Sequence, residues 1–292
     1  MQMNRTGNLM TEMSYSNSKR TFTVSHRKAL SHHMPVSHFH NTYEIFYLMA
    51  GKREFFIKDR TVVIHEGDII IVSPNVLHRT TDTDTPEHER LIMNIHEQHI
   101  SSMHESYQDI LHPLYEQEYR IIRCTLQERL EVTDLARRLL LEMEEQRPGF
   151  EMYAQTLALQ FLITCCRHVK EHRMELPEYI SPMHEQISEI VSYINKHYMD
   201  ELSLNLLADK FYISPYYLSR SFKQATGFSF VEYVNSVRIK EAKQLLEQTS
   251  MQVSLISAKV GFGSVTHFGR VFKAVTGQKP LFYRSGNSGT AF

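Results

Sequence analysis

The chain has 292 residues, three cysteines and a formal net charge of −1 at pH 7. This length is enough for two domains, and three sparse cysteines without metal-ligand spacing fit reduced thiols in a cytosol. The charge is unevenly divided: residues 203–292 hold 11 Lys and Arg against 4 Asp and Glu, a net +7, which leaves −8 for residues 1–202. A basic C-terminal part favours a nucleic-acid partner. The longest uncharged run, residues 152–166, is too short and polar to span a bilayer, and the polar start lacks the apolar segment of a signal peptide. We therefore expect a cytoplasmic protein without membrane contact.

The N-terminal part predicts a flexible arm followed by a small antiparallel β-barrel. Residues 1–19 are rich in Asn, Ser, Thr and Met and show little periodicity. Over residues 20–96, short β-rich runs separated by turn residues are typical of a barrel. The predicted strands are Thr21–Val24, Tyr43–Met49, Glu54–Lys58, Thr61–Ile64, Ile69–Val72 and Leu91–Ile95.

The next part, residues 97–174, predicts a pair of helices. After Ile95 the apolar period changes from two to 3.6. In the first helix Leu126, Leu130, Leu139 and Met143 share one face; Pro148-Gly149 ends it, and a second helix covers Glu151–His172. Both helices carry an apolar stripe. These stripes either pack in the hydrophobic core or, as we predict, form the interface of a homodimer. Residues 175–183, with two prolines, form a predicted linker.

One pattern occurs twice in the C-terminal part, at an offset of 50 residues. Residues 219–227 (SRSFKQATG) align with residues 269–277 (GRVFKAVTG), and the register holds without a gap from Ala208 to Tyr233. Such self-similarity indicates a duplicated supersecondary unit. Each copy predicts a short helix, a tight turn and a second helix.

Capping residues set the bounds of these predicted helices. A serine precedes each motif helix of the first copy, at Ser203 and Ser214, and glycine ends the second helix of each copy, at Gly227 and Gly277. The predicted motif helices are Leu204–Lys210 and Ser214 onward in the first copy, and Val253–Val260 and Ser264–Thr276 in the second. Between the copies, Phe230–Gln248 predicts one amphipathic helix of roughly 28 Å. This approaches the roughly 34 Å between successive major grooves on one face of B-form DNA, so two reading helices can occupy adjacent grooves.

The duplicated segment resembles the AraC/XylS family of bacterial transcription regulators over residues 184–286. The residues that carry the resemblance include YLSRSFK at 217–223, Gly261-Phe262, His267-Phe268, Thr276-Gly277 and Pro280. The resemblance implies a seven-helix domain whose two helix-turn-helix motifs bind one face of DNA, with residues 287–292 as a tail. It assigns base reading and backbone contacts to Tyr216, Ser219, Arg220, Lys223, Thr266, His267, Arg270 and Lys273. Val265 and Gly269 depart from the pattern, because the family often has polar residues there.

The predicted barrel contains a second motif. His38-Phe39-His40 is followed by Glu44, Gly51 and later by His78. Two histidines two residues apart on a strand face the same side. The motif resembles the cupin fold over residues 20–96; in metal-dependent cupins these positions hold one ion. Here His78 comes four residues after Pro74 instead of five and Val76 replaces a glycine, and the resemblance to regulator cupins, which mostly bind small molecules, is closer.

Three interpretations of His38, His40, Glu44 and His78 remain open: an effector pocket, a metal site, or hydrogen bonding within the barrel. We favour an effector pocket that binds a sugar or another polyol, to which Tyr43, Phe46 or Arg79 add contacts. We expect no cofactor, no metal and no catalytic residue. The predicted fold class is α+β, and the predicted function is a ligand-responsive transcription regulator. Its expected partners are double-stranded DNA, a small-molecule effector, a second copy of the chain and RNA polymerase. The alternative is a metal-dependent cupin enzyme, an isomerase or dioxygenase, fused to a DNA-binding domain.

Overall fold

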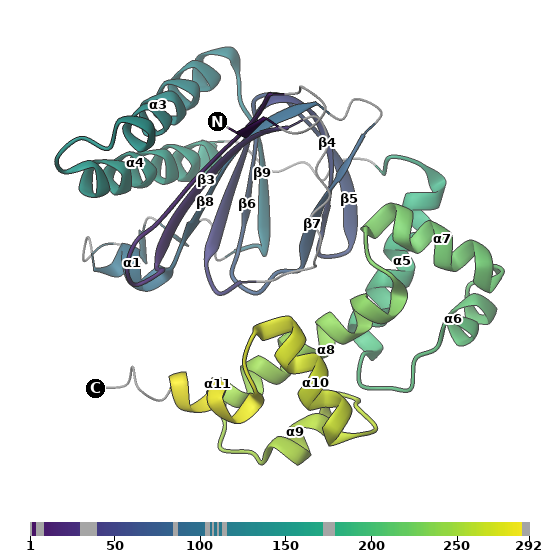
Figure 1. The fold of residues 1–292 in the computed structure, drawn as a ribbon. Helices are drawn as coiled ribbons and strands as arrows, with labels where there is room; N and C mark the ends of the chain where they lie inside the picture. Colours follow the sequence, from purple (N-terminus) through teal and green to yellow (C-terminus); the bar gives the residue numbers. More distant parts are fainter. Residues whose placement is uncertain are drawn as a thin grey trace.

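The N-terminal part of the chain forms a nine-stranded antiparallel sheet among the residues that the structure describes (Figure 1). The computed structural model describes residues 2–3, 9–29, 40–83, 87–102, 106, 108–109, 111–112, 116–171 and 179–287. The strands are β1 Gln2–Met3, β2 Leu9–Ser16, β3 Phe22–Ala29, β4 Tyr43–Ile57, β5 Arg60–His65, β6 Asp68–Val72, β7 His78–Asp82, β8 His88–Ile95 and β9 Tyr119–Arg123. Their order is β1-β2-β3-β8-β4-β6-β9, and β5 and β7 also pair with β4.

Strand β4 folds the sheet into a barrel. Its first half pairs with β6 and β8, and its second half pairs with β5 and β7. The register shifts between Leu48 and Ala50, and Gly51 follows with φ +91° in close contact with the backbone of Glu87 and His88. A side chain at Gly51 would meet both the strained backbone and these atoms. The sequence predicted two strands separated by a turn at Ala50-Gly51, but the chain bends there and remains one strand.

Both faces of the sheet are buried, and strand alternation explains how. On β4, Ile45 and Tyr47 belong to the cluster that packs against the helical hairpin, whereas Phe46 and Leu48 belong to the barrel interior. The same alternation separates Ile69 from Ile70 on β6. A residue on these strands therefore faces either the hairpin or the interior, and Glu44 faces the interior with Phe46.

Four of the described strands, β1, β2, β7 and β9, lie outside the predicted set. Residues 9–16 form β2, which pairs with β3, where a flexible arm was predicted. Its Met13 and Tyr15 pack against the hairpin cluster, and the Tyr15 ring contacts Phe150 at 5.3 Å, so alternate apolar contacts hold this polar strand in place. Strands β7 and β9 were also not predicted.

The helical hairpin consists of α3 Leu126–Glu145 and α4 Phe150–Glu171 and covers one face of the sheet (Figure 1). A short helix, α1 Glu97–Ser101, precedes it. Leu139 and Met143 are buried in the hairpin cluster as expected. Leu126 and Leu130 are exposed, so the prediction that these four residues share one apolar face is wrong. The buried residues of α3 begin only at Val132.

The C-terminal part holds seven helices within residues 179–287. They are α5 Pro182–His197, α6 Leu204–Lys210, α7 Pro215–Thr226, α8 Phe230–Gln248, α9 Val253–Lys259, α10 Val265–Thr276 and α11 Pro280–Asn287. Ser203, Ser214 and Ser264 cap α6, α7 and α10, and Gly227 and Gly277 end α7 and α10 in the left-handed conformation. These caps confirm the predicted bounds of the duplicated motifs.

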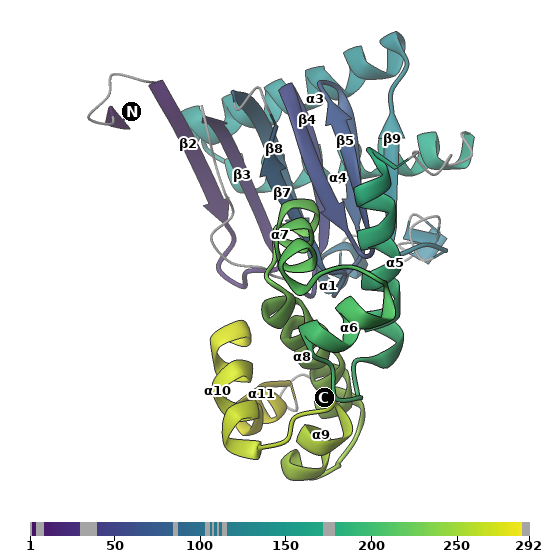
Figure 2. The same ribbon diagram turned by 90° about the vertical axis from the view of Figure 1, so that its right-hand side faces the viewer.

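Helix α8 joins two hydrophobic clusters. Tyr233 and Val237 pack with α5–α7, whereas Ile239 and Leu246 pack with α9 and α10. Arg238 donates to the carbonyl oxygens of Tyr198 and Asp200, a contact within the domain that leaves its guanidinium occupied. Helices α5 and α7 both contact β5, so this domain lies against the barrel (Figure 2). None of the described helices combines the length and apolar character needed to cross a membrane.

Candidate functional site: a barrel pocket and two exposed helices

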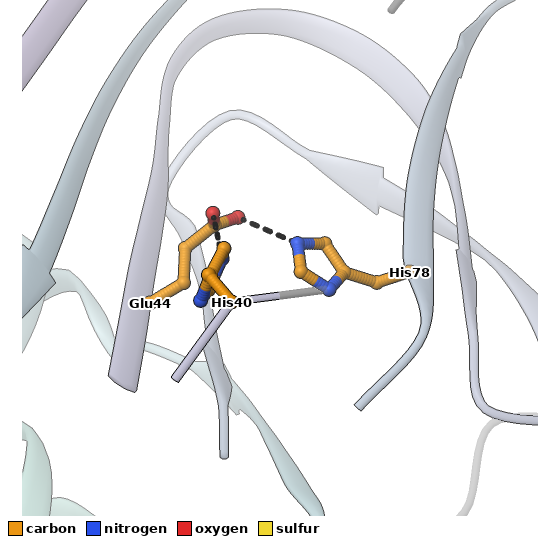
Figure 3. Close-up of side chains that lie close together, drawn as sticks. All are labelled: His40, Glu44 and His78. Carbon is orange, nitrogen blue, oxygen red and sulfur yellow. Dashed lines mark hydrogen bonds and ion pairs between the residues drawn. The ribbon is translucent and has the colours of Figure 1, made fainter. Parts of the chain in front are cut away.

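The barrel interior brings His40, Glu44 and His78 together (Figure 3). Glu44 lies near the start of β4, His40 precedes that strand, and His78 begins β7. The second half of β4 pairs with β7, with Ile57 opposite His78, so the bend in β4 brings β7 back toward Glu44. One ligand atom from each residue lies within 4.8 Å of the others. His38 lies outside the described residues.

The Glu44 carboxylate binds both imidazoles, one on each oxygen. Its Oε2 lies 3.0 Å from Nε2 of His40, and its Oε1 lies 3.4 Å from Nε2 of His78. His78 donates from Nδ1 to the carbonyl oxygen of Val76 at 2.9 Å, which directs its Nε2 toward Glu44. Nδ1 of His40 contacts Thr42 at 2.9 Å, so the ring orientation of each histidine is fixed from its far side.

Burial and charge act in opposite directions on this pair. Burial alone would raise the pKa of the Glu44 carboxyl, but the charge of His78 and hydrogen bonds from both histidines hold that pKa well below its usual range. Burial would lower the pKa of His78, but the Glu44 carboxylate raises it above its ordinary value. These opposite shifts favour an ionised Glu44 carboxylate beside a protonated His78 imidazole.

Aromatic side chains pack beside the cluster of His40, Glu44 and His78. The Phe55 ring stacks on His78 at 6.0 Å, and Phe46 contacts Phe55 edge to face at 5.2 Å. Phe46 thus lies on the same side of the sheet as Glu44, in the barrel interior. Tyr43 and Arg79 do not: Tyr43 packs toward the helical hairpin, and Arg79 points out of the barrel toward Gly227.

A second polar group in the barrel interior was not predicted. Arg53, His88 and Arg90 are all buried; Nη1 of Arg53 lies 3.4 Å from Nδ1 of His88, and Arg90 donates to Thr80 at 3.4 Å. Burial lowers the pKa of Arg90 to about 10, and the Glu44 carboxylate opposes this shift. The sequence could have indicated the position of Arg53, because Arg53 lies two residues before the interior residue Phe55 on the same strand and so faces the same side.

The eight predicted DNA-binding residues are all exposed on the second helix of each motif. Leu218, Phe222 and Ala225 bury the inner face of α7, and Phe268 and Phe272 bury that of α10. The exposed residues are Tyr216, Ser219, Arg220 and Lys223 on α7, and Thr266, His267, Arg270 and Lys273 on α10. Both helices therefore present hydrogen-bond donors and positive charge to solvent, as major-groove recognition requires.

Comparison with known proteins matches both parts of the chain. Residues 21–162 match the family model of an AraC-like ligand binding domain, and residues 207–286 match that of a helix-turn-helix domain. The chain is 25% identical over 240 residues to the HTH-type transcriptional activator RhaS of Enterobacter sp. (strain 638), covering 82% of this chain and 78% of that protein.

Two further similarities are more limited. The bifunctional transcriptional activator/DNA repair enzyme AdaA of Bacillus subtilis (strain 168) is 34% identical over 119 residues, and the chain spans about half of that relative, 54% of its length. A solved structure of ToxT from Vibrio cholerae O395 is 15% identical with a TM-score of 0.37, over 93% of this chain and all of that one.

Proposed function

Because the chain belongs to the AraC family of transcription regulators, with a ligand-binding domain before a helix-turn-helix domain, we propose that its barrel binds a small polyhydroxylated metabolite. The proposed contacts are His40, Glu44 and His78, together with His38 by its place in the sequence motif. Binding at this pocket regulates how α7 and α10 engage DNA. The observation that carries the proposal is the buried Glu44 carboxylate held between two imidazoles.

The chemistry of the pocket suits a ligand with several hydroxyl groups. A buried carboxylate needs hydrogen-bond donors, and ligand hydroxyls can replace those that the imidazoles supply. The histidines offer donors or acceptors according to protonation, so they suit hydroxyls that do both. Phe46 and Phe55 form an apolar surface against which the carbon face of a sugar can pack. A pocket with a few convergent polar groups on an apolar wall is the usual form of a small-molecule site.

The DNA-binding residues are proposed on their exposure and chemistry. Arg220 and Arg270 can form bidentate hydrogen bonds with guanine, while Lys223 and Lys273 can neutralise phosphate. We place the protein in the cytoplasm with its DNA. It acts there as a homodimer on paired half-sites and contacts RNA polymerase. The names of the relatives describe transcription activators.

A metal-dependent enzyme is the competing proposal, and one observation favours it. Two histidine nitrogens and one carboxylate oxygen within 4.8 Å form a donor set that fits a divalent transition metal. The RhaS relative, which matches 82% of this chain, is named a transcriptional activator, and we therefore propose that the chain is not an enzyme.

A thermal-shift screen of the purified full-length protein against sugars, polyols, organic acids and divalent metals tests the proposal. A polyol that raises the unfolding temperature of the wild type, but not of Glu44→Gln, is the expected result. The matched control is Glu89→Gln, which removes a carboxylate 2.9 Å from His26 elsewhere in the barrel. Stoichiometric metal in the purified protein, with stabilisation by metal alone, would contradict the polyol assignment.

A further inference from the structure

One short segment, Asn75–Arg79, contacts both the pocket and the DNA-binding domain. His78 opens β7, and its backbone lies opposite Ile57 of β4. Successive side chains in an extended segment point to opposite faces. His78 therefore faces the barrel interior, while Leu77 and Arg79 on either side of it face outward.

The pocket side of this segment is tied to Glu44 and His40. The His78 imidazole lies 3.4 Å from the Glu44 carboxylate and donates to the carbonyl oxygen of Val76. The backbone N–H of Asn75 donates to the carbonyl oxygen of His40 at 2.8 Å. A ligand that inserts between Glu44 and His78 must therefore displace side chains that are anchored to the segment.

The outward side of the segment is tied to α7 and α8. Leu77 and Phe56 are buried in the same cluster as Phe222 and Phe228 of the DNA-binding domain. Arg79 donates to the carbonyl oxygen of Gly227, the residue that ends α7, and its guanidinium lies 5.4 Å from the centre of the Phe228 ring.

Two further hydrogen bonds connect strand β5 and its turn to the same helices. The Thr61 hydroxyl donates to the carbonyl oxygen of Ala225 at 2.5 Å, and the Tyr233 hydroxyl lies 3.0 Å from the carbonyl oxygen of Lys58. Lys243 of α8 donates to the Asn75 side chain at 3.1 Å. The barrel therefore contacts the C-terminal end of α7 and, on α8, residues from Tyr233 to Lys243.

The fit at Gly227 shows how close this docking is. A Cβ atom at Gly227 would lie 2.6 Å from Cδ of Arg79. A cavity of about 140 Å³ nevertheless remains beside Val76 and Leu77, bounded by Tyr233 and Val237 of α8. The Asn75–Arg79 segment therefore packs closely on the DNA-binding domain at Arg79. At Val76 and Leu77 the cavity leaves room for these side chains to shift.

We infer that the Asn75–Arg79 segment couples the pocket to the DNA-binding domain, and that its outward face is a docking surface that holds this domain in a form with low affinity for DNA. The inference rests on the proposed effector pocket. Filling the pocket displaces His78, weakens the contacts of Leu77 and Arg79, and releases α7 and α8.

Charge determines the direction of this effect. Residues 203–292 have a net charge of +7, whereas the barrel against which they dock, residues 20–96, has nine Lys and Arg and nine Asp and Glu. Docking draws Lys240 to within 3.9 Å of Glu118 and buries Lys243. Because DNA affinity depends on cationic charge near phosphate, holding Lys240 and Lys243 of α8 against Glu118 and Asn75 makes their charge less available to DNA. Release from the barrel should therefore raise affinity.

A double-mutant cycle on the full-length protein tests this coupling. The probe is a DNA fragment that the wild type selects from a random pool, and the readout is its affinity at fixed salt. The proteins are the wild type, Arg79→Ala, Glu44→Gln and the double variant. Matched controls are Arg123→Ala, an exposed arginine on β9, and Glu89→Gln, which removes the carboxylate beside His26.

The inference predicts that Arg79→Ala and Glu44→Gln each raise DNA affinity at least about fivefold, that the double variant gains no more than Arg79→Ala, and that neither control changes it. Independent, multiplying effects, or reduced affinity for Arg79→Ala, would overturn it. If the wild type selects no DNA at all, the proposed regulator function fails instead.

Hydrogen exchange on the same proteins tests the coupling without DNA. Glu44→Gln should speed exchange in the peptide over residues 225–236, with unchanged exchange in α4 as the measure of intact folding. Unchanged exchange at 225–236 in a folded Glu44→Gln variant would also overturn the inference.

Discussion

The Glu44 carboxylate lies 3.4 Å from the imidazole of His78, and both side chains are almost fully buried in the barrel. Such a pair stabilises the fold only while both groups are charged and satisfied, because each buried charge compensates the other. The same pair lies at the centre of the proposed effector pocket, so stability and ligand response should share one pH dependence.

The contribution of His78 to stability should fall as pH rises. Its pKa is raised in the folded state, so its contribution is complete below the ordinary histidine value of about 6.5 and is lost as pH passes its folded value. Glu44 has a lowered pKa, so its contribution is present above about pH 4.3 and is lost as pH falls through the folded value. Urea unfolding of the wild type and His78→Gln should therefore differ more at pH 5.5 than at pH 9. The expected change is about 1.4 kcal/mol for each unit by which the pKa is raised. An equal difference at both pH values would contradict the ion pair.

Arg220 and Lys273 should have different effects on DNA binding. Arg220→Ala should cost on the order of 1–3 kcal/mol and relax specificity at one base position, because a bidentate contact distinguishes bases. Lys273→Ala should weaken binding to all sequences equally and lower the salt slope by about 1. Binding to a set of single-base operator variants at several salt concentrations separates the two. These roles fail if both substitutions only lower the salt slope.

The full-length protein should dimerise through the exposed stripe on α3. Leu130 and Leu141 are 59% and 55% exposed and lie about three turns apart on one side of the helix. Leu130→Glu with Leu141→Glu should give monomers in sedimentation at micromolar concentration, with little change in the unfolding temperature because neither side chain is buried. The matched control, Leu281→Glu, replaces an exposed leucine on α11 and should remain dimeric. A double variant that stays dimeric would place the interface elsewhere.

The isolated segment from Ser181 to Phe292 should fold alone and bind DNA. Its two clusters draw nearly all their buried residues from this segment; Phe56 and Leu77 are the contributions of the barrel. Footprinting should show protected sites about one helical turn apart. Absence of such protection in a segment that is folded by circular dichroism would contradict this prediction.

The helical C-terminal part was predictable because its signals are local. A serine cap before α6, α7 and α10 and a glycine after α7 and α10 mark ends that depend on neighbouring residues only. Strand β7 was not predictable in the same way. Its sequence, HRTTD, is polar, and its pairing with β4 depends on a bend at Gly51 that the sequence suggested was a turn.

The His40–Glu44–His78 cluster was predictable from the spacing of its motif, and the other buried polar residues of the barrel were not. The motif placed His40, Glu44 and His78 at one site, and the structure brings these three side chains together, although His40 precedes β4 and does not lie on a strand as predicted. Arg53 and Arg90 were missed, because they meet in the interior only after β4 and β8 curve around it. Arg79 was expected to contact the effector, but its side chain points out of the barrel toward Gly227. It follows His78 directly on the strand, and adjacent residues of a strand face opposite sides.

Operator affinity measured with and without the polyol that most stabilises the wild type tests most directly whether the barrel site controls DNA binding. The proteins are the wild type, His40→Ala with Glu44→Ala, and His26→Ala with Glu89→Ala as a matched histidine–glutamate pair outside the pocket. We expect the polyol to change the affinity of the wild type and of the control pair at least about fivefold, and to leave that of the His40–Glu44 variant unchanged. A folded His40–Glu44 variant that responds like the wild type would contradict this expectation.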